Sequence, residues 1–234
     1  MGVITGAIKD TYTALDARMK IVDVIANNLA NANTTGFKRD FGHILENKIG
    51  SEAATQVDLT PGQIISTGNE LDAALNGAGF FVVDTPNGQR YTRSGNFAVN
   101  DAGELVTKEG LKVMSTSNSS ITVGEGKVEI RDGGVITVDG NEVGTLKVVN
   151  FSDAKNLQKE GLSRFVWKGA PGGVQTVTDP PVKGGYLERS NVNAIDEMVH
   201  LMSAYREFES VQRALKTLMT EMDGKLIQEL GKLG

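Results

Sequence analysis

Histidine and cysteine, which serve often as metal ligands, nucleophiles and general bases, are scarce in this chain of 234 residues. Its two histidines are His43 and His200, and it has no cysteine, which excludes thiolate nucleophiles, disulfides, zinc–cysteine sites and iron–sulfur clusters. His200 falls within a helical pattern, where a lone histidine is typical of a packing or surface residue. The sequence therefore predicts no metal centre.

The motifs of catalytic sites are also missing. Paired carboxylates such as Asp196-Glu197 lie in a charge-rich helical pattern, which indicates a solvated helix face. Asp139-Gly140 and similar pairs are turn residues, and the spacing of calcium-binding loops does not occur. The fragment Gly77-Ala-Gly79 is followed by Val82, where a dinucleotide-binding loop has its third glycine. We expect no catalytic residues, no cofactor and no enzyme activity.

The overall charge is mildly negative, with 24 basic and 29 acidic side chains and a formal net charge of −5. Nucleic-acid-binding proteins normally carry a basic field, so no nucleic acid is expected as a partner. No apolar run approaches the ~20 residues that span a bilayer, and we expect no direct membrane insertion. Asp10 and Asp16 interrupt the first residues, which lack the apolar stretch of a cleavable signal peptide. We expect the protein to be cytoplasmic or to be exported without such a signal.

A long helix is predicted at each end of the chain. Residues 3–31 contain no proline, and their apolar seam advances by alternating steps of four and three, a coiled-coil-like pattern. This helix should end near Asn33, with Gly36 as its left-handed stop. Residues 191–230 predict a second helix, with Asn193 as the N-cap and an apolar stripe that drifts around it. The seam of the first helix consists of Ile4, Ile8, Thr11, Leu15, Arg18, Val22, Ile25 and Leu29.

The middle of the chain is rich in glycine and β-branched residues. Runs such as Phe80–Asp84 and Ile121–Val123, separated by Asn-Gly and Asp-Gly turns, predict many short antiparallel strands. The expected fold class is α+β, with long N- and C-terminal helices flanking a mainly antiparallel β domain. The helices either pack on each other, leaving surface for neighbouring copies, or fold down on the sheet. We expect an N-terminal helix and asparagine-rich motif in residues 1–36, an extended linker in 37–70, the β domain in 71–187 and the C-terminal helix in 188–234.

Two segments are unusual in composition. Ile25–Lys38 carries four asparagines near a helix end, where asparagine is costly unless its amide has a partner. Gly185–Asn193, which joins the β part to the last helix, is also rich in amides. We expect these amides to bond between copies of the chain; a frayed helix end and an ordinary N-cap loop are the alternatives. If they act only between copies, replacing Asn28 or Asn31 by leucine should leave the β domain folded.

With these segments the chain resembles the flagellar axial proteins of bacteria, which include rod and hook proteins. The resemblance spans nearly the whole chain in the expected order. Its matches are Asn27–Phe37, the β-domain motif in Leu71–Val82, Tyr91–Phe97 and Asp101–Val106, and Leu187–Asn193 followed by Met202–Glu209.

The resemblance implies a structural protein of the basal-body rod. In this family the terminal helices of many subunits pack into an inner tube, the β domain lies outside it, and the assembled rod transmits motor torque through the periplasm and contains the export channel. The implied partners are further copies, neighbouring proximal rod subunits, the distal rod protein, other axial proteins and the flagellar type III export apparatus. The implied assembly-interface residues are Ile8, Leu15, Val22, Asn27, Asn28, Leu29, Asn31, Phe37, Leu187, Asn191, Asn193, Met198, Met202, Tyr205 and Phe208.

Within the family, the chain is most similar to the proximal rod proteins. Only the segment Lys38–Asn69 separates the first helix from the Leu71 motif, and distal rod proteins usually have more residues there. A distal-rod or hook-like subunit is the next alternative. A secreted β-rich module that binds the cell wall is the alternative from a different class.

Overall fold

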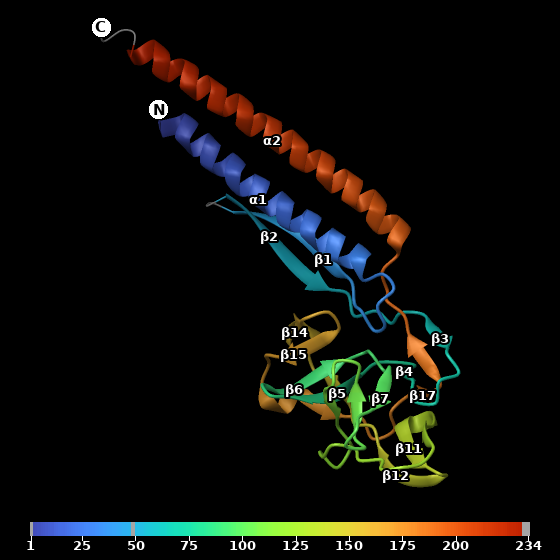
Figure 1. The fold of residues 1–234 in the computed structure, drawn as a ribbon. Helices are drawn as coiled ribbons and strands as arrows, with labels where there is room; N and C mark the ends of the chain where they lie inside the picture. The colour runs from blue at the N-terminus through green and yellow to red at the C-terminus, as the bar shows by residue number, and fades with distance from the viewer. Residues whose placement is uncertain (1, 48–49, 231–234) are drawn as a thin grey trace. The chain divides into compact units, whose positions relative to one another are not determined.

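The computed structural model describes the backbone of residues 2–47 and 50–230 (Figure 1). Contacts between residues divide the chain into two compact units. Unit 1 comprises Met1–Ala30, Arg39–Asp58 and Asn193–Gly234, and unit 2 comprises Asn31–Lys38 and Leu59–Val192. The asparagine-rich motif is therefore divided: its first part ends the helix of unit 1, and Asn31–Lys38 belongs to unit 2.

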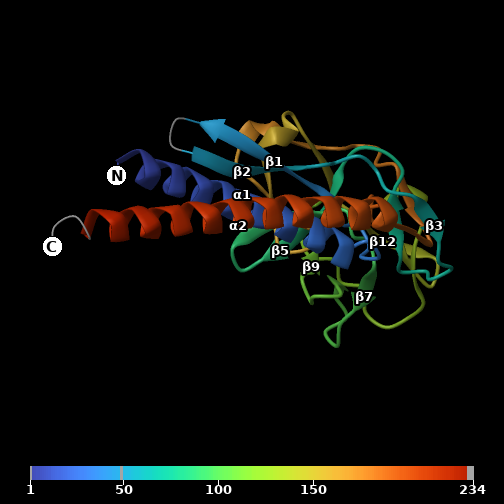
Figure 2. The same cartoon turned by 90° about the horizontal axis from the view of Figure 1, so that it is seen from above.

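Unit 1 has three layers. Helix α1 (Gly2–Ala30) lies between helix α2 (Ala194–Leu230) and a hairpin of β1 (Asp40–Asn47) and β2 (Gly50–Val57), as Figure 1 shows. The two helices lie side by side, also in the view from above (Figure 2), so helix-on-helix packing is found. Among the residues described, no helix is both long and apolar enough to span a membrane.

Helix α1 is packed along its length against both α2 and the β1–β2 hairpin. The seam positions from Ile8 to Leu29 are half-buried, whereas Ala17 retains only 1% of its exposure. Gly42 of β1 brings the hairpin close to α1, because a Cβ added there would lie 2.6 Å from Cδ1 of Ile21. The side chain of Ile4, the first predicted seam residue, lies outside the described part of the chain.

The predicted helix ends are confirmed. Helix α1 stops at Ala30, and Gly36 adopts a left-handed conformation with φ of 66°. The Asn193 carboxamide caps α2, since its Oδ1 accepts the N–H of Ile195 at 3.1 Å. Asp196 and Glu197 follow in the first turn, where the helix dipole favours negative charge.

The hairpin in unit 1 replaces much of the predicted linker. The sequence predicts an extended linker over residues 37–70, but within that segment Asp40 pairs with Val57 and the antiparallel register continues to Asn47 opposite Gly50. Strand β2 reads Gly-Ser-Glu-Ala-Ala-Thr-Gln-Val, which is poor in β-branched and aromatic residues. Local strand preference is therefore weak there, and packing on α1 stabilises the strand.

Unit 2 is built from antiparallel pairs. The main sheet has the strand order β14-β15-β6-β5-β9-β8-β7, with β13 pairing with both β5 and β16. A separate three-stranded sheet has the order β10-β11-β12, and two-stranded pairs join β17 to β4 and β18 to β3. The strands are β3 (Ile64–Ser66), β4 (Ala73–Leu75), β5 (Phe80–Thr85), β6 (Gly88–Thr92), β7 (Phe97–Val99), β8 (Leu105–Thr107), β9 (Lys112–Val113), β10 (Val128–Ile130), β11 (Val135–Val138), β12 (Asn141–Thr145), β13 (Val148–Phe151), β14 (Leu157–Glu160), β15 (Arg164–Trp167), β16 (Val174–Thr176), β17 (Val182–Gly184) and β18 (Tyr186–Glu188). Short 3-10 turns occur at Asp132–Gly134, Ala154–Asn156 and Pro171–Gly173.

One apolar core joins these sheets. Leu75, Phe81, Leu105, Ile136 and Leu146 are completely buried in it. A side chain the size of leucine or phenylalanine contributes about 1.5–3 kcal/mol when it is fully buried, so this core fixes the β domain.

The turn predictions are largely confirmed, and one strand prediction is wrong. Asp139 and Gly140 join β11 to β12 with φ values of 48° and 86°, as a tight hairpin turn requires. Ile121 and Val123 are buried, but Thr122 between them makes only an isolated bridge to Glu104 and no strand forms. Their apolar character reflects core packing rather than membership of a sheet.

Candidate assembly interface

Asn28 ties the end of α1 to the start of β1. Its Nδ2 donates to the main-chain oxygen of Asp40 at 2.8 Å, and its Oδ1 accepts the Asp40 N–H at 2.9 Å. The carboxamide thus imitates a backbone pair, and its 1% exposure shields both bonds from water. This explains why a poor helix former stands here.

Glu197 brings α2 into the same cluster. This carboxylate in the first turn of α2 is 1% exposed and forms an ion pair with Arg39 at 2.5 Å. Its second oxygen accepts a weaker bond from Asn28 at 3.4 Å, and Nδ1 of His200 lies 4.0 Å from the carboxylate. One buried acid therefore holds all three layers of unit 1 at one end.

A second buried acid organises unit 2. Glu188, on β18, accepts the ammonium of Lys38 at 2.5 Å and the N–H of Gly62 at 2.9 Å on Oε1. Nη1 of Arg93 lies 3.4 Å from Oε2, and Lys38 also donates to the main-chain oxygen of Thr60 at 2.7 Å. Burial lowers the pKa of Arg93, and the charge of Glu188 offsets part of that effect.

Phe37 lies beside this cluster and is completely buried. The Lys159 ammonium lies 3.7 Å from the centre of its ring and donates to the main-chain oxygen of Lys38 at 2.7 Å. Gly36 permits the close approach, because a Cβ there would lie 2.3 Å from the nitrogen of Ser94. Its own N–H donates to the main-chain oxygen of Glu188 at 2.8 Å.

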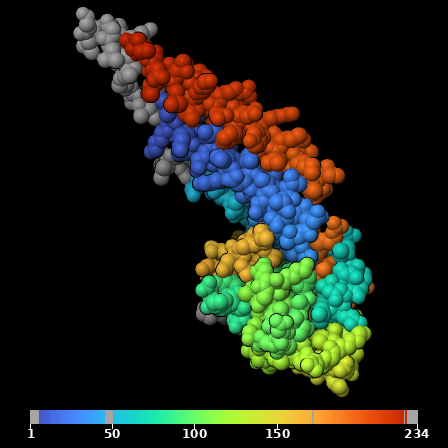
Figure 3. All heavy atoms as spheres, in the orientation of Figure 1, coloured from blue at the N-terminus to red at the C-terminus, as the bar shows by residue number. Residues whose placement is uncertain are grey.

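Helix α2 carries an exposed apolar band near its N-terminal end. The exposure of these side chains ranges from 51% to 72%. Their spacing of three and four residues places them on one face. This face borders the half-buried residues Leu201 and Phe208 on the side packed on α1, and the ring centres of Tyr205 and Phe208 lie 6.2 Å apart. The long open side of α2 is visible in the space-filling view (Figure 3). The band consists of Ile195, Met198, Val199, Met202 and Tyr205.

Comparison with known proteins identifies the family. Three family models match the chain in order: "Flagella basal body rod protein" over residues 12–38, "Flagellar hook protein FlgE/F/G D1 domain" over residues 74–140, and "Flagellar basal body rod FlgEFG protein C-terminal" over residues 183–229. A flagellar basal-body rod protein FlgF of Caulobacter vibrioides is 33% identical, covering 95% of this chain and 98% of the relative. The chain belongs to the flagellar basal-body rod protein family. It is a structural rod subunit and not an enzyme.

Relatives with two different names match the chain. The FlgF of Mesorhizobium japonicum is 32% identical over 94% of this chain and 97% of the relative. The FlgG of Bacillus subtilis is 31% identical over 91% of this chain and 92% of the relative. Rod proteins of both names thus match this chain over more than nine-tenths of their own length, and the cell-wall-binding alternative is not better supported.

The rod-family interface residues predicted from the sequence fall into three groups. Asn28, Asn31 and Phe37 are buried within the chain. The half-buried group is Ile8, Leu15, Val22, Leu29, Leu187, Asn191 and Phe208. The exposed group is Asn27, Asn193, Met198, Met202 and Tyr205. A role of the whole set in assembly stays a prediction.

The idea that the asparagine amides act only between subunits is wrong for Asn28, because its carboxamide bonds to Asp40 and Glu197 within the chain. Asn31 also has a partner in its own turn, since its Oδ1 accepts the hydroxyl of Thr34 at 3.1 Å. Sequence reasoning missed Lys38, Arg93 and Glu188, because their pairing joins segments far apart in the chain. The only local signal was the basic pair Lys38-Arg39 directly after the motif.

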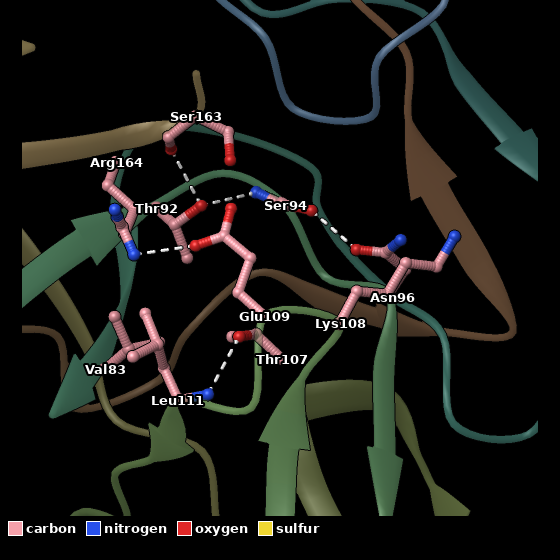
Figure 4. A pocket seen from close by; sticks show the side chains of 10 residues that line it. All are labelled: Val83, Thr92, Ser94, Asn96, Thr107, Lys108, Glu109, Leu111, Ser163 and Arg164. Atoms are coloured by element: carbon pink, nitrogen blue, oxygen red, sulfur yellow. Dashed lines mark hydrogen bonds and ion pairs between the residues drawn. The ribbon is translucent and has the colours of Figure 1, made fainter. Parts of the chain in front are cut away.

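A small polar cavity in unit 2 belongs to the scaffold. It measures about 40 Å³ and lies between β6, the β8–β9 turn and the β14–β15 turn (Figure 4). Thr92 Oγ1 both donates to the main-chain oxygen of Ser163 at 2.8 Å and accepts the N–H of Ser94 at 3.0 Å. Arg164 and Glu109 form an ion pair across it at 2.6 Å. These bonds hold the turns together.

Replacing Glu188 by glutamine should destabilise the rod protein strongly. The change leaves Lys38 and Arg93 buried without a carboxylate, and breaking a buried ion pair in this way costs about 3–5 kcal/mol. Urea unfolding measures the loss. The control Glu70→Gln removes a carboxylate that pairs with the exposed Lys127, and it should cost no more than about 1 kcal/mol. Equal small losses in both variants would contradict the role of Glu188.

The Asn28→Leu variant should loosen unit 1 and leave unit 2 folded. Two buried bonds to the Asp40 backbone are lost, at a cost of about 1–3 kcal/mol. Hydrogen exchange should then accelerate at the Asp40 amide but not at amides of the unit 2 core. Asn33→Leu, at an exposed position of the same motif, should leave the Asp40 amide unchanged. If exchange at the Asp40 amide is the same in Asn28→Leu as in the wild type, the assigned role of Asn28 is wrong.

Proposed function

We propose that the chain is a subunit of the proximal rod and that its terminal helices pack with those of neighbouring copies, in a coiled-coil-like arrangement, to form a tube. The observation that carries this proposal is the apolar band on α2. Contiguous apolar surface of this kind marks a site of protein association. Its three-and-four spacing suits a helical partner.

Because the apolar band lies on one side of unit 1 only, a contact through it favours an assembly that can keep adding copies. Helix α1 is covered by α2 and by the hairpin, whereas α2 is covered by α1 and otherwise exposed. A contact between the band and a different surface of the next copy is heterologous, and such contacts build helical filaments when they do not close into a ring. A rod that transmits torque requires this kind of polymer.

The proximal position is supported by the resemblance of the sequence to that group. The segment Lys38–Asn69 between the first helix and the Leu71 motif is short, and it contains the hairpin of unit 1. In this role the subunit reaches the periplasmic part of the basal body through the flagellar type III export apparatus. Its partners are further proximal rod subunits and the distal rod protein.

Introducing a charge into the band should prevent assembly without unfolding the chain. Met202→Lys places an ammonium in the centre of the band, at a position where 57% of the side chain is already exposed. The free energy of unfolding should change by less than about 0.5 kcal/mol, whereas swimming should be lost. Circular dichroism during urea unfolding and a soft-agar motility assay measure the two effects. Ser203→Lys, at an adjacent exposed position outside the band, is the control and should swim. If the Met202→Lys strain swims, the band is not part of the assembly interface.

The position along the rod is tested by imaging. A copy carrying a small peptide label is expressed in a motile strain, and isolated hook–basal bodies are examined by electron microscopy. Label next to the inner-membrane ring is expected for a proximal subunit. Label along the distal rod would assign the chain to the distal group, and absence of label from functional basal bodies would contradict a rod subunit altogether.

A further inference from the structure

Unit 2 carries an excess of exposed acid on its three-stranded sheet and in the turns beside it. Four carboxylates there have no basic partner among the residues that the structure describes. The two basic side chains of the same sheet, Lys127 and Arg131, are already ion-paired with Glu129. The net charge of the sheet surface is therefore negative. We call these four residues the acidic patch: Glu125, Asp132, Asp139 and Glu142.

The β14–β15 hairpin of unit 2 carries the opposite charge. Lys155 and Lys168 are exposed, and neither forms an ion pair within the described residues. Glu160 of the same hairpin is ion-paired with Arg90, and the charge of Lys168 acts on it only as a minor influence. Lys155 and Lys168 lie at the same end of the hairpin, because the N–H of Lys168 donates to the main-chain oxygen of Asn156 at 2.9 Å.

We call Lys155 and Lys168 the basic patch. Lys159 on β14 is not part of it, because its ammonium contacts the Phe37 ring and the main-chain oxygen of Lys38.

The acidic patch also includes one exposed apolar neighbour. Val143 follows Glu142 on β12 and is 43% exposed. Apolar contacts surrounded by polar groups are the usual composition of a protein interface.

The two patches cannot neutralise each other within one chain. They lie on different sheets, and Figure 1 shows β11 and β12 at the other end of unit 2 from β14 and β15. Complementary patches at different places on one surface suit a heterologous contact between copies, in which opposite potentials fix the register and suppress wrong partners.

Strand addition at this edge is disfavoured. The register between β11 and β12 shifts at Ile136 and Thr137, which makes β12 irregular, and Glu142 places a charge on the same edge strand. Bulges and charges are the features by which proteins block edge-to-edge pairing. These features leave side chains, not the backbone edge of β12, to contact a partner.

We propose that the acidic patch of one copy binds the basic patch of a second copy, as a contact additional to that of the helices. The inference rests on the proposed function in one respect, namely that several copies assemble in the rod. It goes beyond that function by assigning a second pair of surfaces in unit 2 and a second copy as the partner.

The test uses the absence of cysteine from the chain. The full chain with Glu142→Cys and Lys155→Cys is expressed in place of the wild type, and isolated basal bodies are treated with a mild oxidant. Disulfide-linked multiples of the chain should form when both cysteines are present and not with either one alone. The control pair Asp101→Cys and Lys155→Cys moves the first cysteine to the exposed β7–β8 turn, outside both patches, and should give no multiples.

The possible results separate this inference from the rod assignment. If the double-cysteine chain is recovered in basal bodies and gives no cross-link, the patch contact is wrong and the rod assignment stands. A cross-link to a protein of different mass would overturn the choice of a second copy as the partner. If even the unmodified chain is missing from basal bodies, the proposed function fails instead.

Charge exchange provides an independent measurement. Glu142→Lys places a positive charge in the acidic patch and should reduce swimming. Combining it with Lys155→Glu restores opposite charges across the contact and should recover swimming. Equal swimming of the single variant, the double variant and the wild type would overturn the proposal.

Discussion

The buried carboxylate of Glu188 joins three segments of unit 2 that are far apart in the sequence. A charge without exposure to water is tolerated only when it is paired and hydrogen-bonded. Lys38, Arg93 and the N–H of Gly62 meet that requirement, and each comes from a different segment. The positions of Gly36, Phe37 and Lys159 follow from it, since they pack directly around Lys38 and the Glu188 backbone.

Unit 1 also contains a buried carboxylate that is paired with a basic side chain. Glu197 is buried against Arg39, the residue directly after Lys38, and Asn28 adds the amide bonds that hold the start of β1. Two neighbouring basic residues therefore bind two buried acids, one in each unit. Because the strongest polar contacts are used within the chain, the exposed surface left for partners is of a different kind: the apolar band on α2 and the separate charged patches of unit 2.

Local patterns in the sequence predicted the elements but not the contacts between distant segments. Both helices were predicted because period, caps and the Gly36 stop act over a few residues. The hairpin of β1 and β2 was not, because β2 contains alanine and glutamine where strands usually have branched side chains, and its stability comes from packing on α1. Residue types singled out Asn28, but its intrachain role depends on Asp40 and Glu197, and nothing local distinguishes a partner within the chain from one in another copy.

The pairing of chain ends has a consequence for the order of folding. Asn28 and Glu197 are separated by 169 residues, and Lys38 and Glu188 by 150. Closing loops of this length costs entropy before the contacts are gained, so structures with many distant pairings form slowly. Because α2 is the last element of the chain, α1 has no α2 to pack against until that part of the chain is present. A chain that emerges from one end first, from a ribosome or from a narrow channel, keeps its leading segment unpaired for most of that passage, and unit 1 closes only when the second end is free.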